Sequence, residues 1–266
     1  MQTEVIHTFV VLAYKESAYL EECIKSVLNQ KYPSRVVIGT STPNDHIRGL
    51  AEKYSLDIIV NDDSHGIGYD YDFAASCGET ELVTIAHQDD FYDYTYSARM
   101  VAAYAESKDP LMVFPGYYVI KDGKRRYMDL NFVVKGILLF PLRFRSLRGT
   151  RFFKRLALRF GDPICCPAVA YVTRRLQMPL FACDDLSCSV DWWAYEKMST
   201  MPGEFVYVKD RLMGHRLHGD TTTAKTIGED RRTIEDVYIL EKFWPNWLAK
   251  VIARPYKLGE RANRLD

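Results

Sequence analysis

The first ninety residues alternate short, β-branched apolar runs with segments in which apolar side chains recur every three or four residues. The predicted elements are strands at 5–12, 35–40, 58–60 and 82–86 and helices near 17–30 and 45–54. Two parallel strands need a crossover connection, so strands that alternate with helices form parallel βαβ units. The pattern therefore predicts an α/β fold with a Rossmann-like, mostly parallel central sheet flanked by helices.

The later part of the chain is expected to add other elements to this sheet. The segments 113–121 and 124–128 flank Asp122-Gly123, a dipeptide that favours a two-residue hairpin. Additional antiparallel strands are therefore predicted there. Apolar residues at helical spacing near the C-terminus predict C-terminal helices.

Charge is unevenly distributed along the chain, although its 35 Lys/Arg and 35 Asp/Glu residues cancel. Residues 1–100 carry 7 basic and 16 acidic side chains, whereas residues 121–180 carry 14 basic and 3 acidic ones. An acidic first part suits cations, and a basic middle suits anions. A neutral chain without a recognised reader motif argues against nucleic acid as a partner.

Nothing in the sequence indicates secretion or insertion into a membrane. The longest apolar runs fall far short of the roughly 20 residues that span a bilayer, and the N-terminus lacks the features of a signal peptide. The six cysteines include no CxxC pair. We therefore expect a cytoplasmic protein with free thiols.

Two adjacent carboxylates follow the predicted strand at 82–86. Asp89 and Asp90 come directly after His87-Gln88. Open α/β sheets bind ligands at the carboxyl ends of their strands, and hard divalent cations prefer oxygen ligands. Adjacent Asp residues are also common in solvated turns. The strand before them favours the metal interpretation for Asp89.

Two further polar positions each have a structural and a chemical interpretation. Asp191 opens the helical run 192–198, where an Asp is an ordinary N-cap and could equally act as a general base toward a bound hydroxyl. His218 lies in the polar segment 214–223, which is either a surface loop or a phosphate and cation site. The residue pattern alone leaves these alternatives open.

Four segments of the chain occur in an order and spacing that are typical of one enzyme family. They are Phe9-Val10-Val11-Leu12-Ala13-Tyr14-Lys15-Glu16 with the helix after it, Gln88-Asp89-Asp90, the segment 188–193, and the segment 215–223. Over about residues 5–225 the chain thereby resembles the family 2 glycosyltransferases, inverting enzymes with the GT-A fold. The second segment is similar to the family's metal motif, the third to its catalytic-base segment, and the fourth to its His-containing loop.

The resemblance implies the transfer, with inversion, of a sugar from a nucleotide-diphosphate sugar, with a UDP-sugar favoured. The implied acceptor is a hydroxyl of a glycan or lipid-linked glycan in cell-surface polysaccharide synthesis. The Gln-x-x-Arg-Trp motif of the processive synthases is absent, which favours transfer of a single sugar. Residues 1–100 would form the nucleotide-sugar-binding half, 101–225 the acceptor-binding and catalytic-base half, and 226–266 a C-terminal helical extension.

The resemblance also implies roles for particular residues. Asp191 would be the catalytic base, and Asp89 with His218 would hold Mn²⁺ or Mg²⁺. The nucleotide sugar would be bound by Ala13, Tyr14, Glu16, Thr40, Ser41, Gln88, Arg216 and His218.

Three positions depart from the family pattern. His87 stands where the first Asp of the metal motif is common, Val190 stands where a Glu often precedes the base, and 39–43 lacks the usual carboxylate for the base or ribose. Two other functions therefore stay open. One is a nucleotidyltransferase, for which a Gly-rich phosphate loop is missing. The other is a non-catalytic nucleotide- or glycan-binding protein of the same fold.

The segment 143–160 combines a basic stripe with an apolar face on a helical wheel. The stripe consists of Arg148, Arg151, Arg155 and Arg159. This pattern is typical of a helix that packs on its own domain with a solvated basic edge, and equally of an interfacial helix on an anionic membrane surface. A polyprenyl-diphosphate-linked acceptor would suit the second alternative, with the protein peripheral at the inner face of the cell membrane.

Overall fold

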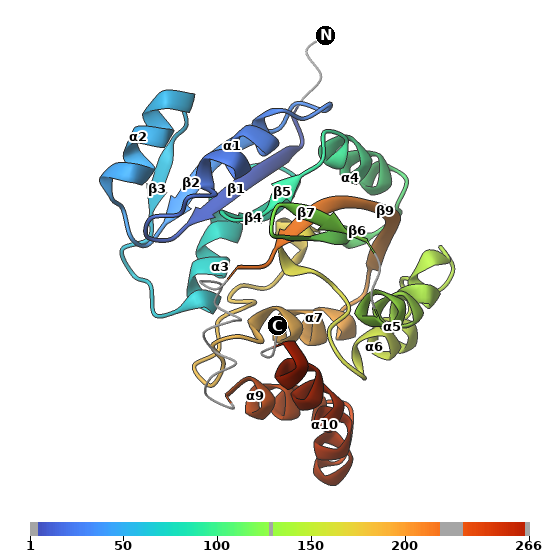
Figure 1. Cartoon of the computed structure of the whole chain (residues 1–266). Helices are drawn as coiled ribbons and strands as arrows, with labels where there is room; N and C mark the ends of the chain where they lie inside the picture. The colour runs from blue at the N-terminus through green and yellow to red at the C-terminus, as the bar shows by residue number, and fades with distance from the viewer. Residues whose placement is uncertain (1–4, 128–129, 219–230, 264–266) are drawn as a thin grey trace.

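One nine-stranded sheet runs through the protein in the computed structural model, which describes residues 5–127, 130–218 and 231–263 (Figure 1). The strand order is β3-β2-β1-β4-β8-β6-β9-β5, with β7 paired to β6. The strands are β1 (His7–Ala13), β2 (Arg35–Thr40), β3 (Ile58–Val60), β4 (Leu82–His87), β5 (Phe91–Tyr92), β6 (Pro110–Lys121), β7 (Lys124–Arg126), β8 (Ala170–Tyr171) and β9 (Glu204–Arg216).

The first four strands of this order are parallel, and helices connect them. The α-helices of the described residues are α1 (Leu20–Leu28), α2 (Asp45–Tyr54), α3 (Ile67–Cys77), α4 (Tyr96–Ala105), α5 (Leu130–Leu139), α6 (Arg151–Leu158), α7 (Val190–Thr200), α9 (Arg231–Leu240) and α10 (Asn246–Asn263). The predicted βαβ units are therefore confirmed. Antiparallel pairs join β4 to β8, β8 to β6 and β6 to β7, as the hairpin signal indicated for the last pair.

Helices cover both faces of the sheet, and the strand periodicity explains why. Phe9 and Val11 belong to the apolar cluster under α1, α2 and α4, whereas Val10 belongs to the cluster that contains side chains of α3, α6, α7 and the C-terminal helices. Successive side chains of a strand point to opposite faces, so an uninterrupted apolar run is buried on both. The resulting mixed α/β architecture is the one that the sequence predicts.

The hairpin between β6 and β7 has the predicted turn. Both central residues, Asp122 and Gly123, have positive φ angles of 53° and 71°. This left-handed geometry fits the twist of paired strands and favours Asn, Asp and Gly. In the described parts of the chain, no helix is both long and apolar enough to cross a bilayer.

The basic stripe predicted at 143–160 is not a single helical surface, which corrects the interpretation of that segment. Arg148 precedes α6, is only 8% exposed and forms an ion pair with Glu204 (Nη2–Oε2 2.7 Å). Arg155 pairs with Glu196, and the Arg159 guanidinium lies 3.7 Å from the centre of the Trp244 ring. Carboxylates and aromatic rings that are distant in sequence therefore hold three of the four stripe arginines against the protein.

Candidate functional site

The carboxyl ends of β1, β2 and β4 meet at one edge of the sheet. Ala13 is paired in register with Thr40, and Leu12 with His87. Ligands of open α/β sheets bind beyond such ends, where loops diverge from the strands. Seven of the ten predicted site residues lie at these three strand ends or in the loops that follow them, whereas Asp191 comes from α7 and Arg216 and His218 from the end of β9.

Gln88 joins the loop after β4 to the loop after β1. The Tyr14 amide donates to Gln88 Oε1, and Gln88 Nε2 donates to the Tyr14 carbonyl, each over 3.0 Å. Two opposed hydrogen bonds fix the Gln88 side chain, so it shapes the floor of the site. The Tyr14 ring is half exposed beside this floor, a position from which it can stack on a planar ligand.

Asp70 of α3 supplies a carboxylate beside the loop after β2. It accepts hydrogen bonds from Ser41 Oγ (3.2 Å) and from Asn61 Nδ2 (2.8 Å). Asn61 follows β3, so three polar side chains from three elements converge at the ends of the strands. The structure thus places a carboxylate near the position where the sequence of the loop after β2 lacks one.

The turn after β4 holds two adjacent Asp residues in different environments. Asp90 is 1% exposed and its Oδ1 accepts from the Arg216 amide (2.9 Å) and contacts His215 Nδ1 (3.1 Å). Burial alone would raise the pKa of Asp90, but the charge and hydrogen bond of His215 outweigh it and hold this pKa below its usual range. Asp89 is partly exposed, and its Oδ2 lies 2.9 Å from His218 Nε2.

This turn has the donor set of a divalent metal site. His87, Asp89 and Asp90 each offer one ligand atom, and these atoms lie within 4.8 Å of one another. Asp90 Oδ2 is buried and has no hydrogen-bond partner among the described residues, so one acceptor in the group is left for a cation. Carboxylate oxygens with an imidazole nitrogen suit Mn²⁺ or Mg²⁺. The residues therefore fit the implied metal.

Arg216 lies beneath the turn. Its Nε donates to the Asp89 carbonyl (2.9 Å), its Nη2 donates to Glu22 (2.7 Å), and its guanidinium lies over the Tyr19 ring. The side chain is thus occupied with the backbone of the turn and with α1. These contacts let Arg216 hold the turn that carries Asp89.

Asp191 approaches the same site from the first turn of α7. Asp191 is partly exposed, and its carboxylate accepts from the Trp192 amide (2.8 Å). The helix begins earlier than predicted, so Ser189 is its N-cap and Asp191 is its second residue, which corrects the N-cap interpretation. Burial raises the pKa of Asp191, and the charge of His87 acts in the opposite direction. His87 therefore lies within electrostatic reach of Asp191, and Tyr71 Oη lies 2.9 Å from His87 Nε2.

A second carboxyl group, Asp162, belongs to this side of the site. Burial raises the pKa of Asp162 well above its ordinary value, the charge of Asp191 raises it further, and Lys135 and Arg232 oppose the shift. The Asp162 side chain accepts from the Ile164 amide (2.9 Å). Two carboxyl groups thus share this end of the site with Lys135 and Arg232.

The remaining predicted residues are less directly placed. Thr40 is fully buried and its hydroxyl accepts from the Thr42 amide (3.0 Å), so its side chain shapes the loop. Ala13 is also buried, whereas Glu16 is exposed. Of the segment 214–223, the part from 219 onward lies outside the described residues.

The motifs give no sign of Asp70, Asp162 or Glu235. Each of them lies in a segment without a motif and reaches its position through the fold. Glu235 of α9 is the clearest case, because it binds the loop before α7 from 46 to 48 residues away. The only sequence signal for such a role is an acidic residue among the apolar positions of an amphipathic helix, and this signal is weak.

Known proteins share a family and a fold with this chain. The model of the family described as "Glycosyl transferase family 2" matches residues 8–177. No curated protein sequence gives a match. Among solved structures, residues 1–349 of S. aureus TarS superpose with a TM-score of 0.63 at 15% identity, covering 96% of this chain and 71% of that one.

Two other enzymes have similar folds. The mannosyltransferase PcManGT from Pyrobaculum calidifontis, in complex with GDP-Man and Mn²⁺, gives a TM-score of 0.60 at 18% identity, with 98% and 76% of the two chains covered. Glucosyl-3-phosphoglycerate synthase from Mycobacterium tuberculosis, with Mn²⁺, UDP and its product, gives 0.61 at 13%, covering 90% and 80%. At such identities these likenesses establish the GT-A fold alone, but the family match extends over more than half of the sequence, and the chain therefore belongs to glycosyl transferase family 2.

Proposed function

We propose that this protein is an inverting glycosyltransferase that moves one sugar from a nucleotide-diphosphate sugar to a hydroxyl of a glycan or lipid-linked glycan, with Asp191 as the base. One observation carries the proposal. A partly exposed carboxylate with a raised pKa lies within electrostatic reach of the turn that bears His87, Asp89 and Asp90. A base and a diphosphate site on one sheet edge are what a single displacement at an anomeric carbon requires.

The donor would lie across the ends of β1, β2 and β4. Tyr14, Gln88 and Ser41 would contact the nucleotide, and Asp70 could accept N–H groups of a base because its carboxylate faces the same loop. A uridine nucleotide is the first candidate. S. aureus TarS is known with UDP-GlcNAc and PcManGT with GDP-Man, so both nucleotides belong in the test.

In the reaction, Asp191 accepts the proton of the acceptor hydroxyl while that oxygen attacks the anomeric carbon. The bond from this carbon to the diphosphate breaks on the opposite side, which inverts the configuration and releases a nucleoside diphosphate. Asp89, with His218 beside it and His87 and Asp90 nearby, would hold Mn²⁺ or Mg²⁺, which supplies positive charge to the diphosphate. Arg216 keeps the turn that carries these residues in place.

The experiment distinguishes the role of Asp89 from that of Asp191. Asp89→Asn should remove the metal-dependent part of nucleoside diphosphate binding in calorimetry, because the amide is a poor ligand for a hard cation. Asp191→Asn should keep that binding and lose transfer by about 10²- to 10⁴-fold, the usual contribution of a general base. Screening nucleotide sugars with the wild type identifies the donor.

Asp57→Asn is the matched control, because Asp57 is exposed and precedes β3 at the opposite end of the sheet. Asp57→Asn should leave both the metal-dependent binding of nucleoside diphosphate and the sugar transfer unchanged. Metal-dependent affinity that survives in Asp89→Asn would contradict the metal assignment. Normal turnover in Asp191→Asn would remove Asp191 from the mechanism, and release of diphosphate from a nucleoside triphosphate would indicate a nucleotidyltransferase.

A further inference from the structure

Helix α5 presents an apolar face to solvent. Ile137 is 67% exposed, Val133 and Val134 are each 46% exposed, and the face continues into Phe140, which is 52% exposed. Leu139, on another side of the same helix, is buried in the core. No part of the described chain covers this face, and large apolar side chains that are neighbours on one exposed surface indicate an interaction site.

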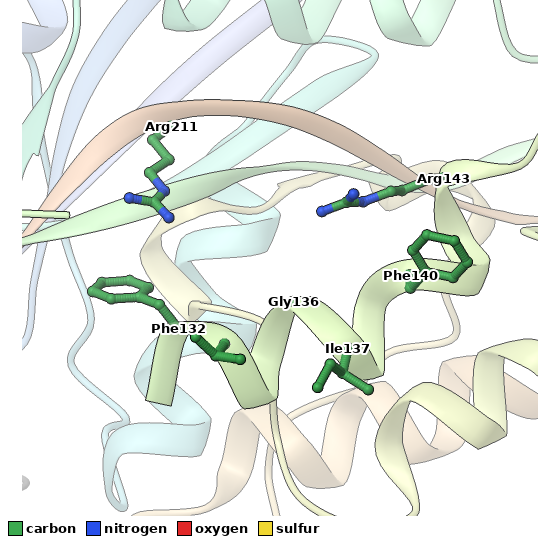
Figure 2. A pocket seen from close by; sticks show the side chains of 7 residues that line it. Phe132, Gly136, Ile137, Phe140, Arg143 and Arg211 are labelled. Atoms are coloured by element: carbon green, nitrogen blue, oxygen red, sulfur yellow. The ribbon is translucent and has the colours of Figure 1, made fainter. Parts of the chain in front are cut away.

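The face borders a groove of about 410 Å³ between α5 and β9. Figure 2 shows Arg211 and Arg143 on one side of this groove and Phe132, Ile137 and Phe140 on the other. The guanidinium of Arg211 lies 5.0 Å from the Phe132 ring centre, and that of Arg143 lies 5.7 Å from the Phe140 ring centre. The apolar face and the cations are therefore parts of one surface.

The charge of this surface is unbalanced. Residues 121–160 contain twelve Lys/Arg and two Asp/Glu. Several of these cations are neutralised inside the protein, as Arg148 and Arg155 are, but Arg143 is exposed and pairs with no carboxylate of the described residues. Helix α6, which packs against α5, adds exposed Arg151 and Phe152. An apolar face beside the exposed guanidinium group of Arg143 complements a surface that is apolar inside and anionic outside.

We propose that the α5 face, defined as Val133, Val134, Ile137 and Phe140 with Arg143 and Arg211, docks on an anionic lipid bilayer. The apolar side chains would enter the boundary between headgroups and acyl chains, and the guanidinium groups would pair with lipid phosphates. The proposed membrane contact is therefore the α5 face and not the arginine stripe of 148–159, because most of those arginines bind other parts of the protein.

The opposite face of α5 points toward the acceptor side of the candidate site. Lys135 Nζ donates to Tyr117 Oη (2.9 Å), and its charge acts on Asp162. Docking through α5 would therefore bring the region around Asp162 and Asp191 to the membrane, where a lipid-linked acceptor is located. The docking itself does not depend on the proposed function and is tested without any substrate.

The test is co-sedimentation of the full chain with vesicles of phosphatidylcholine alone and of phosphatidylcholine mixed with phosphatidylglycerol, at low and high salt. The wild type should bind the anionic vesicles, and salt should weaken the binding. Ile137→Ser combined with Phe140→Ser should reduce partitioning by about tenfold or more, because two apolar side chains are removed from the boundary. Arg143→Glu should reduce it by at least about fivefold, the effect of one basic residue near such a surface.

Ile234→Ser is the matched control, because Ile234 has the same side chain and is 68% exposed on α9. It should bind as the wild type does. Hydrogen exchange of the wild type provides a measurement that needs no variant, and vesicles should slow exchange within 130–140 and leave α9 unchanged. Calorimetry of nucleoside diphosphate binding, expected to be unchanged in every variant, keeps this proposal separate from the proposed function.

Absence of binding to anionic vesicles would overturn the proposal, as would equal binding by the wild type and the Ile137→Ser/Phe140→Ser variant. A dimer without lipid, dissociated by the same double substitution in analytical ultracentrifugation, would assign the face to a second copy of the chain and would also overturn it. Binding to neutral and anionic vesicles alike, unaffected by Arg143→Glu, would contradict the role of the guanidinium groups.

Discussion

Asp89 and Asp90 are adjacent in the chain, yet their environments assign them different tasks. Asp90 is enclosed and held by His215 and by the amide of Arg216, so it fixes the turn. Asp89 is left partly exposed, and its side chain contacts that of His218. A rigid carboxylate beside an accessible one is an arrangement that preorganises a metal ligand without blocking it.

At the same scale, Asp162 and Asp191 form a pair in which position decides which group keeps a proton. Burial raises the pKa of both, and repulsion by Asp191 raises that of Asp162 further. The first proton taken up by the pair therefore goes mainly to Asp162. Asp191 stays ionised at higher acidity than its partner, as the proposed role of general base requires.

We predict that kcat/KM falls with decreasing pH at an apparent pKa above the ordinary Asp value of about 4. Protonation of Asp191 removes the base, so its raised pKa moves this loss toward neutral pH. Asp162 has already taken up its proton at that pH, so Asp162→Asn, which keeps an oxygen for the Ile164 amide, should leave the loss at nearly the same pH. Complete pH profiles measure this, with Asp57→Asn as the control, and a loss that moves to lower pH in Asp162→Asn would show that Asp162 is still ionised when Asp191 takes up its proton.

At the scale of elements, α9 fixes the approach to α7. Glu235 is 2% exposed and its carboxylate accepts five hydrogen bonds from Ser187, Cys188 and Ser189. Burial alone would raise the pKa of Glu235, but the hydrogen bonds outweigh it and lower this pKa. A charged acceptor on one helix therefore holds the loop that leads to Asp191 on another.

Glu235→Ala should destabilise the protein by about 3 kcal/mol, because it leaves several partly buried donors without an acceptor. It should also lower kcat while nucleoside diphosphate affinity is kept, since α7 and not the donor side loses its support. Urea unfolding and calorimetry measure the two effects. Glu241→Gln, an exposed site next to α9, is the control. Loss of donor affinity in Glu235→Ala, or an unaltered kcat, would be inconsistent with a local role.

Elements were predictable from the sequence where local periodicity decides them. β2 and β3 have the predicted bounds, and α2 begins and ends at Asp45 and Tyr54 as its spacing indicates. The segment 143–160 was not predictable in this way. A helical wheel assumes that Arg148 is helical and ignores Glu204 and Glu196, which meet the arginines only in the folded chain.

At the scale of the whole molecule, the parallel half of the sheet follows from the βαβ pattern, whereas the order β8-β6-β9-β5 does not. β6 pairs in parallel with β9, and β8 has only two residues between β4 and β6, so long-range packing sets this half. The candidate site likewise has residues that the motifs predict and residues that only the fold reveals. Motifs locate Asp89 and Asp191, but only the fold brings Asp162 near Asp191 and Asp70 to the loop after β2.

The centre of this sheet also contains a buried imidazole. His7 of β1 is fully buried, with Nδ1 2.8 Å from Ser34 Oγ and Nε2 2.9 Å from Thr84 Oγ1. Burial lowers the pKa of His7 to about 3. The folded protein therefore keeps this ring neutral in mildly acidic solution, where the unfolded chain takes up a proton.

Because the pKa of His7 is lower in the folded state, its contribution opposes folding progressively as pH falls from about 6.5, the ordinary His value, toward 3. Between about pH 7.5 and pH 5 this linkage should reduce the free energy of unfolding by about 2 kcal/mol. His7→Gln cannot take up the proton, so the variant should lose this part of the pH dependence. It should also be less stable at neutral pH, because it loses the buried ring with its contacts to Ser34 and Thr84. Urea unfolding of both proteins across this range, above the titration of most carboxylates, measures the difference; identical slopes would mean that His7 is protonated in the folded state.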